Sequence, residues 1–391
     1  MISDKPTRAP VRQQGLSLVE LMVALTLGLL LTAGMIQLFG STKLTFQTND
    51  AAARVQENGR FAMELIKRDL RTAGTHGFCA ARIEITNHLD ESCGGGVSDF
   101  FDPDRAVVGW EYDGTGIGDD YTLPSNLDPS GASAGDWSST SDQGTLPDVL
   151  DGLVVPGSDV LVVRSMNVIP GLTADPGVPN NTNQASINLL SAHGLPDDAI
   201  VLVTNCATGA DLFQNRTNAN ASAFSAGSGS CSNPGPGNVN VDWSTSYDDS
   251  MQTFTVGATA YYVGLNANTG EPALYRFNLT TGTNGSASGP EELVQGVESM
   301  QVLYGFSAAA PAGDGQSVDN WLSADQVPAD GWGQVIALRL AVGIRSPENA
   351  DGDQNTVVFD LSGADISAAG DGRLRQPFST TVALRNRLIV I

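Results

Sequence analysis

The chain has 391 residues and a formal net charge of −23, from 43 acidic and 20 basic side chains. Residues 72–391 carry 37 acidic and 11 basic side chains, whereas residues 43–71 carry six basic and four acidic ones. Such an acidic chain argues against nucleic acid as a ligand, because phosphate contacts need Lys and Arg. The length allows one large domain with insertions, and the abundant Gly, Pro, Ser, Thr and Asn favour a loop-rich β protein.

The N-terminus combines a basic leader with an apolar run. Residues 1–15 hold three basic side chains against one acid, and from Leu16 to about residue 40 Glu20 is the one charge. About 24 residues form a helix of roughly 36 Å, which is long enough to span a bilayer. Because basic residues precede the run and none follow it directly, the N-terminus is expected in the cytoplasm and the remainder outside.

Three interpretations of this segment compete. A secretory signal has an apolar region of about 7–15 residues before a small-residue cleavage site, and this run is longer. A plain anchor fits the length but leaves Glu20 unexplained, since a carboxylate in a span costs up to about 3 kcal/mol. The third interpretation rests on residues 15–20, Gly-Leu-Ser-Leu-Val-Glu, which resemble the cleavage site of type IV prepilins.

That resemblance implies roles for three residues. Prepilin peptidase would cut after Gly15, so the leader stays in the cytoplasm and the apolar helix is kept. Leu16 would become the new N-terminus and be N-methylated. Glu20 would pair with the N-terminal amine of a neighbouring subunit during assembly, which gives a reason for a carboxylate in the span. This class usually has Phe at the first mature position, where this chain has Leu16.

Beyond the apolar run the pattern predicts an amphipathic continuation of the helix over residues 41–74. Apolar residues recur at three-to-four spacing, charges fill the other face, and Gly74 is typical of a helix end. A helix over residues 16–73 would be about 87 Å long. Its second half is expected to pack on a globular domain through an apolar stripe, which comprises Val55, Phe61, Ala62, Leu65, Ile66 and Ala73.

Parts of the chain resemble the PilW family of minor pilins. In the helix the similar segments are ARVQENGRFAMEL at residues 53–65 and RDLRTAG at 68–74. Shorter similar islands follow at residues 157–164, 260–263, 274–276, 292–298 and 384–387. The resemblance covers both ends and these islands, but not residues 85–155 and 207–250.

Short segments rich in β-branched and aromatic residues, bounded by Gly, Pro, Asn or Asp, predict strands. They lie at residues 160–163, 200–204, 260–264, 274–278, 302–306, 335–344, 357–361 and 380–391. Residues 112–147 and 214–250 are turn-rich and are expected to form surface insertions or mobile loops. The predicted fold is α+β, with the long helix packed on a large, mainly antiparallel, pilin-like β-rich domain over residues 75–391.

All four cysteines follow the span, in the part expected outside the cytoplasm. An even number in an oxidising compartment favours disulfides. Three pairings are possible, and the local one is preferred because each pair flanks a loop rich in Gly, Ser or Asn. The preferred pairs are Cys79 with Cys93 and Cys206 with Cys231. A metal site is disfavoured, because no Cys-x-x-Cys spacing occurs and His76 beside Cys79 is a weak signal.

No catalytic, cofactor or metal site is expected. The chain has three histidines, His76, His88 and His193, and it lacks a nucleophile elbow, a zinc-protease helix and a phosphate-binding loop. Residues 351–355, Asp-Gly-Asp-Gln-Asn, resemble the start of a calcium loop. The sixth position is Thr356 where such a loop needs Gly, and the twelfth is Ser362 where it needs an acid, so a solvated turn is favoured.

The family resemblance implies a non-enzymatic minor pilin that takes part in type IV pilus assembly or initiation, in a tip or priming complex. It would act by helix bundling and subunit contacts. Implied partners are prepilin peptidase, other minor pilins, the major pilin and a tip adhesin. The protein would start as a single-pass inner-membrane protein with a periplasmic domain and then enter the pilus. A type II secretion pseudopilin is the alternative within this class, and a membrane-anchored periplasmic enzyme or binding protein is the alternative outside it.

Overall fold

The structure is a computed structural model. It describes residues 15, 17–74, 84–90, 101–102, 105–141, 144–227, 229–230, 236–239, 242–278, 289–308, 317–350 and 356–384. The chain divides into two compact units, Met1–Asp50 and Ala51–Ile391, and each is described by itself below.

Helix α1 comprises Leu18–Leu70 and contributes to both units. It is followed by a turn over residues 71–74, where Gly74 has a φ of 66°, a conformation that glycine adopts without strain. In the first unit the apolar side chains of the helix are exposed. In the second unit one face is buried, as the predicted amphipathic pattern requires. The buried residues are Ala51, Val55, Gly59, Ala62, Met63, Ile66 and Leu70.

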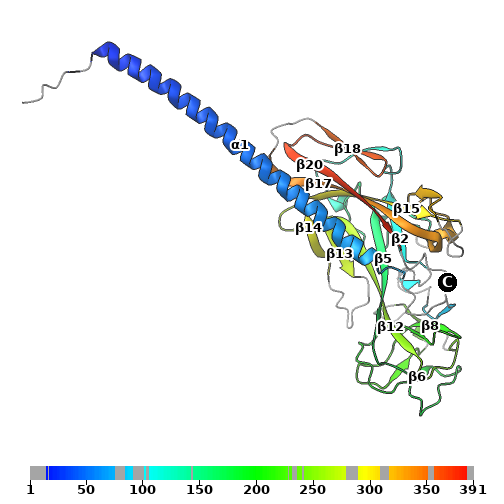
Figure 1. Cartoon of the computed structure of the whole chain (residues 1–391). Coiled ribbons are helices and arrows are strands. Elements are labelled where there is room, and N and C mark those ends of the chain that lie inside the picture. The colour runs from blue at the N-terminus through cyan, green and yellow to red at the C-terminus, as the bar shows by residue number, and fades with distance from the viewer. Residues whose placement is uncertain are drawn as a thin grey trace, which may run out of the picture. The chain divides into compact units, whose positions relative to one another are not determined.

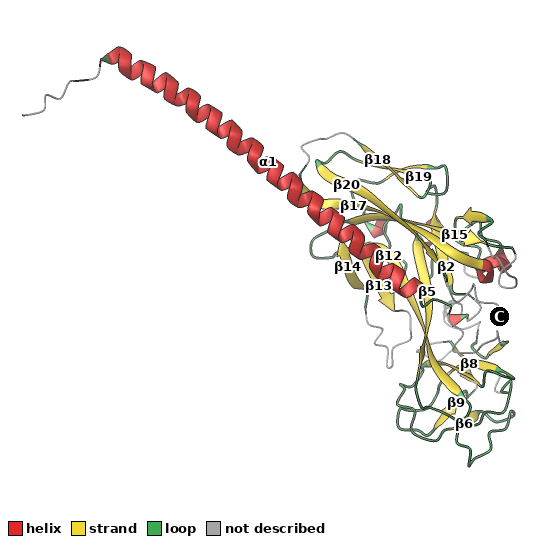
Figure 2. Ribbon diagram, viewed as in Figure 1, coloured by secondary structure: helices red, strands yellow, loops and turns green. Residues whose placement is uncertain are grey.

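The second unit is dominated by strands (Figure 2). Among the described residues, its largest sheet has nine strands, and every pairing except that of β1 with β8 is antiparallel. In spatial order the strands are β1 (Ile85–Asn87), β8 (Ala210–Gln214), β7 (Ile200–Thr204), β12 (Gln252–Leu265), β5 (Val160–Val168), β2 (Val107–Tyr112) and β4 (Trp137–Ser138). Strand β13 (Pro272–Asn278) also pairs with β12, and β14 (Glu291–Gln295) pairs with β13.

A second, antiparallel sheet carries the later strands of the chain. Its order is β16 (Asn320–Leu322), β15 (Val297–Phe306), β17 (Val335–Asn349) and β20 (Arg373–Ala383). A smaller sheet contains β18 (Val357–Leu361), β19 (Ala364–Ala368) and β3 (Asp120–Thr122), with β19 and β3 parallel. Two further pairs are β6 (Ser186–Asn188) with β9 (Ala223–Ser225), and β10 (Gly229–Ser230) with β11 (Gly237–Asn238). The described 3₁₀ helices are η2 (Pro129–Gly131), η3 (Ala134–Asp136) and η5 (Ala329–Gln334).

Two hydrophobic cores stabilise the second unit. The main core joins the buried helix face to both large sheets, and it contains Ile66, Trp110 and Trp332. The other core lies within residues 169–251, the inserted lobe, which connects β5 to β12 and contains Phe224 and Trp243. Figure 1 shows β12 running from the middle of the large sheet towards β6 and β8 in this lobe. The predicted α+β fold, a long helix on a mainly antiparallel β-rich domain, is therefore confirmed.

The predicted strands have the right location but several wrong boundaries. The last one, expected over residues 380–391, is β20, which begins at Arg373; residues 385–391 lie outside the described part of the chain. Most side chains of β20 are partly or fully exposed, so its N-terminal half lacks the apolar run on which the prediction relied.

Residues 112–147 and 214–250 were expected to form surface insertions or mobile loops. The second segment does lie in an insertion between β5 and β12, but both segments contain strands and buried aromatic residues. The first segment sends Trp137, which is 2% exposed, into the main core. The second holds β9 and supplies Phe224 and Trp243 to the core of the inserted lobe. Isolated aromatic residues within turn-rich sequence anchor these segments, and a turn signal alone does not register such anchors.

Phe61 was placed on the apolar stripe of the helix, but it is 53% exposed.

Candidate assembly site on the helix

The start of α1 carries the residues predicted to function in processing and assembly. Gly15 is exposed, and Leu16 lies outside the described residues. The amide of Ser17 donates a hydrogen bond to Oε2 of Glu20 at 3.1 Å, and the amide of Glu20 donates to Oγ of Ser17 at 3.2 Å. This reciprocal pair is a capping box, which satisfies two backbone N–H groups at the start of the helix. Glu20 therefore has a local structural role that the sequence prediction did not include.

Small residues follow Glu20 along one face of the helix. Ala24, Gly28 and Thr32 succeed it at intervals of four residues, and with neighbouring leucines they line a shallow groove that begins at Glu20. The hydroxyl of Thr32 donates to the carbonyl of Gly28 at 2.8 Å, so this polar group is satisfied within the helix. Small side chains allow the backbone of a second helix to approach closely. The first unit thus offers a carboxylate at one end of a surface suited to helix packing.

The first unit also meets the requirements of a membrane span. Its most apolar stretch of 18 residues has a mean hydropathy of 2.1, and none of that stretch is buried in the structure. Exposed leucines, such as Leu18 and Leu30, are unfavourable in water, so they need lipid or other helices around them.

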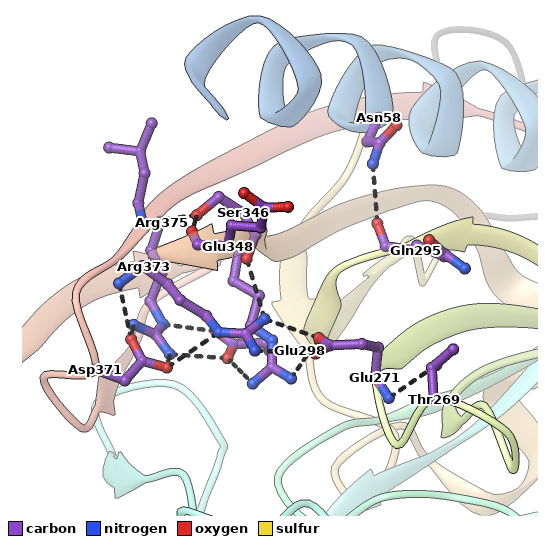
Figure 3. Close-up of polar contacts among 12 residues, drawn as sticks. Asn58, Thr269, Glu271, Gln295, Glu298, Ser346, Glu348, Asp371, Arg373 and Arg375 are labelled. Atoms are coloured by element: carbon purple, nitrogen blue, oxygen red, sulfur yellow. Dashed lines mark hydrogen bonds and ion pairs between the residues drawn. The ribbon is translucent and has the colours of Figure 1, made fainter. Parts of the chain in front are cut away.

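In the second unit the helix is held by close packing and by polar contacts. A Cβ on Gly59 would lie 2.4 Å from the Phe378 ring, so only glycine lets the helix approach β20 this closely. Figure 3 shows Asn58 reaching from the helix to Gln295, whose carbonyl accepts its amide at 3.0 Å. The hydroxyl of Tyr261 in β12 also donates a short hydrogen bond to Asp69.

A network of arginines and carboxylates joins the two large sheets next to this contact (Figure 3). Glu298 in β15 is 2% exposed and receives two hydrogen bonds from Arg375, at 2.8 and 3.0 Å. Arg345 bridges Glu298 and Glu271 at 3.0 and 2.8 Å, and Arg373 binds Glu271 with both terminal nitrogens. Partial burial opposes ionisation of Glu271, but hydrogen bonds from Arg373 and Arg345 outweigh it and lower its pKa. Asp371, which accepts from Arg375, is the third carboxylate, so three arginines face three carboxylates around these strands.

Two buried carboxyl groups, those of Glu111 and Asp159, form a second connection between the sheets. Asp159 accepts the amides of Tyr112 at 3.1 Å and Val302 at 2.8 Å, which links β2 to β15. Burial, followed by the neighbouring Asp159 charge, raises the pKa of Glu111 to about 10. Burial also raises the pKa of Asp159 to about 7, against the lowering effect of its backbone hydrogen bonds. At neutral pH Glu111 is therefore protonated.

Neither described histidine forms a catalytic arrangement. Nε2 of His88 lies 2.6 Å from Oδ1 of Asp211, and both residues are buried. The hydroxyls of Ser244 and Tyr247 also donate to Asp211, so Ser244 is bonded to the carboxylate and not to the imidazole. His193 stacks on an aromatic ring in the inserted lobe, where burial lowers its pKa. His76 lies outside the described residues.

Of the four predicted disulfide cysteines, the structure describes Cys206, which is disulfide-bonded. Cys79, Cys93 and Cys231 lie outside the described residues, so the preferred pairing stays a prediction. Residues 351–355, the calcium-like run, also lie outside them. Within the described part of the chain, no three His, Cys, Asp or Glu side chains are grouped so that they could hold a metal ion.

Sequence reasoning did not identify the buried network, the carboxyl pair or the exposure of Phe61. The buried charges had a weak signal, because Asp159 directly precedes the apolar start of β5 and Glu298 lies near the start of the largely buried β15. A charged residue in such a segment needs a partner, but the partner comes from a strand far away in the sequence.

The chain was compared with known proteins. Residues 11–36 match the profile of the prokaryotic N-terminal methylation motif. Residues 260–386 match the profile described as type IV pilus-assembly protein W, PilW. No curated protein matches. A similar solved structure is the type IV-like pilin TTHA1219 from Thermus thermophilus, with 18% identity and a TM-score of 0.21, over 34% of this chain and 70% of that one.

The profile matches agree with the geometry at both ends. The methylation motif contains Gly15, Leu16 and Glu20, and the PilW match contains β20 and the carbonyl of Gln295, both of which contact the helix. These two matches support a PilW-type minor pilin with a role in type IV pilus assembly.

Proposed function

We propose that this minor pilin joins a tip or priming complex of the pilus by packing its N-terminal helix into a bundle with those of other pilins. The observation that carries the proposal is the position of Glu20 at the head of an exposed, small-residue helix face. In a bundle the groove lined by Ala24, Gly28 and Thr32 would admit a neighbouring helix.

Glu20 would then fix the register of that packing. A carboxylate among apolar helices is costly unless it meets a positive charge. An N-terminal amine has a pKa near 8 and is largely protonated at neutral pH. Cleavage after Gly15 would create such an amine at Leu16 in every subunit, and N-methylation of that amine would leave its charge in place. In the single chain, the capping box with Ser17 holds the carboxylate until a neighbour arrives.

A place at the tip is supported by the size of the domain. The second unit comprises Ala51–Ile391 and includes an inserted lobe with a core of its own. A repeating position along a filament encloses each domain between neighbours, whereas a terminal position leaves one side free for such an insertion. We propose the inner membrane with a periplasmic domain as the location before assembly, and the pilus as the location afterwards. The further partners are prepilin peptidase, other minor pilins, the major pilin and a tip adhesin.

Two substitutions separate the capping role of Glu20 from its assembly role. Glu20→Gln keeps an acceptor for the Ser17 amide but removes the charge. Ser17→Ala removes half of the capping box and keeps the charge. Mass spectrometry of the mature N-terminus should show normal cleavage and methylation in both variants. Glu20→Gln should reduce incorporation into sheared pili by about tenfold or more, as expected for loss of one partly buried ion pair.

Ser17→Ala should keep most of the incorporation, because a lost cap costs only about 1 kcal/mol of helix stability. Immunogold labelling of the chain should mark pilus ends. Normal incorporation of Glu20→Gln would refute the charge-pairing role, and labelling along the whole filament would refute the tip position.

A further inference from the structure

One face of the helix in the second unit points outward. The opposite face is buried by Val55, Ile66 and Leu70. On the outward face, Phe61 is 53% exposed although large aromatic side chains are normally covered. Residues seven apart lie on the same side of an α-helix, so Arg54, Phe61 and Arg68 form one row.

Basic side chains surround Phe61. Arg60 and Lys67 form the adjacent row, and neither makes an ion pair or side-chain hydrogen bond with the described residues. Arg68 and Arg71 are 67% and 54% exposed, and their contacts with Asp69 and Glu64 are long, at 3.4 and 3.9 Å. Exposed pairs of this kind contribute little to stability.

The other described arginines of the second unit are already engaged. Each makes an ion pair, a hydrogen bond or a cation–π contact; they are Arg105, Arg164, Arg216, Arg276, Arg339, Arg345, Arg373 and Arg375. Residues 51–74 carry five basic and three acidic side chains, and residues 75–391 carry 37 acidic and 11 basic ones. The outward helix face is therefore a basic surface on a strongly acidic unit.

We propose that this basic face docks onto the acidic globular domain of another pilin-class subunit, with Phe61 inserted in an apolar recess and Arg60 and Lys67 facing carboxylates. The inference rests on the proposed assembly role and names a surface distinct from Glu20. The globular domain of this chain is itself an example of the required partner, because its net charge is complementary to the helix face. Aromatic and arginine side chains are the residue types that dominate interface energies, and flanking charges steer association.

A lipid surface is a poorer match for the same face. Glu57 and Glu64 lie on it, one turn to either side of Phe61. A folded domain can place its carboxylates opposite the basic side chains alone, whereas a uniform layer of anionic headgroups would also face the two glutamates. A helix that lies in a membrane interface also needs a broad apolar face, whereas this exposed face offers one aromatic side chain.

The test is photo-crosslinking of the full chain in piliated cells. A photoreactive residue is introduced as Phe61→p-benzoylphenylalanine, and the control is Val358→p-benzoylphenylalanine, at a residue of similar exposure in β18. We expect a Phe61 adduct with a pilin-class subunit, a second copy of this chain included, and identification of its acidic domain by mass spectrometry. Arg60→Glu with Lys67→Glu should lower the adduct yield about tenfold, and Arg60→Lys should preserve it.

The possible failures are distinguishable. In one failure the chain is found in sheared pili, but its Phe61 position yields only lipid adducts, only adducts within the same chain, or no adduct. That result would overturn this inference and leave the assembly role intact. An unchanged yield in the charge-reversed chain would likewise overturn it. A chain absent from sheared pili would refute the assembly role together with the inference. Circular dichroism of each variant checks the fold, which these exposed positions should not affect.

Discussion

The buried carboxyl pair makes a prediction about stability and pH. The pKa of Glu111 is higher in the folded protein, at about 10, than its ordinary value of 4.5. Unfolding therefore releases a proton between these values, so the free energy of unfolding falls as pH rises through that window. The slope for one such group is about 1.4 kcal/mol per pH unit. Between pH 7 and pH 9 the expected loss from Glu111 alone is about 3 kcal/mol, and Asp159, whose pKa in the folded protein is about 7, adds a smaller loss as it completes its ionisation.

Glu111→Gln should remove most of this loss, because the amide stays neutral and can still donate to Asp159. The assay is urea unfolding of the mature chain in mild detergent at pH 7, 8 and 9, followed by tryptophan fluorescence, which reports on the buried Trp110 in the same strand. Glu64→Gln, at an exposed helix position, is the matched control and should keep the wild-type slope. Equal stability of the wild-type chain at pH 7 and pH 9, or an unchanged slope in Glu111→Gln, would refute the assignment of a protonated Glu111.

Three further predictions concern the packing of the helix, the arginine network and the cysteines. Gly59→Ala should destabilise the protein by about 1–3 kcal/mol, because the added methyl overlaps the Phe378 ring, and thermal unfolding measures this. Arg375→Gln should cost about 3–5 kcal/mol in denaturant unfolding, because it removes the bidentate partner of the buried Glu298. Thiol labelling of unreduced protein should find no reactive cysteine, and a labelled Cys206 would contradict its disulfide bond.

Matched controls separate these effects from general damage. Gly34→Ala should not destabilise, because a Cβ there meets open space and alanine favours the helix by about 1 kcal/mol. Phe378→Leu should partly restore Gly59→Ala by making room for the methyl. Arg276→Gln breaks an ion pair with the exposed Glu291 and should cost less than about 1 kcal/mol. Equal losses in Arg276→Gln and Arg375→Gln would contradict the importance given to burial.

The helix and its start could be predicted from the sequence because their signals are local. The apolar run, the leader motif and Gly74 each depend on neighbours within a few residues. The same holds for β7 and β18, whose ends agree with the predicted ranges because turn residues flank them on both sides. What Glu20 does within the chain was not predicted, although Ser17 at the N-cap position followed by Glu20 is a capping-box pattern.

The remaining features depend on contacts between distant segments. Phe61 occupies an apolar-looking position in the sequence, yet the buried face turned out to be centred on Gly59 and Ile66. The Gly59 contact with Phe378 in β20 decides which side of the helix faces inward, and 319 positions separate the two residues. Likewise Asp159 is satisfied by amides from β2 and β15, and no sequence window contains both strands.

The contacts that hold the helix and the surface of the inserted lobe come from different parts of the chain. The PilW match, residues 260–386, contains Gln295, Phe378 and the arginine network. These residues lie against the part of the helix that belongs to the second unit. The inserted lobe, residues 169–251, lies outside both profile matches and has its own core. A lobe whose stability depends on its own aromatic residues can change its surface without disturbing the contacts that fix the helix. With the proposed tip position, substitutions on that surface should alter the contacts of the subunit there while leaving its incorporation unchanged.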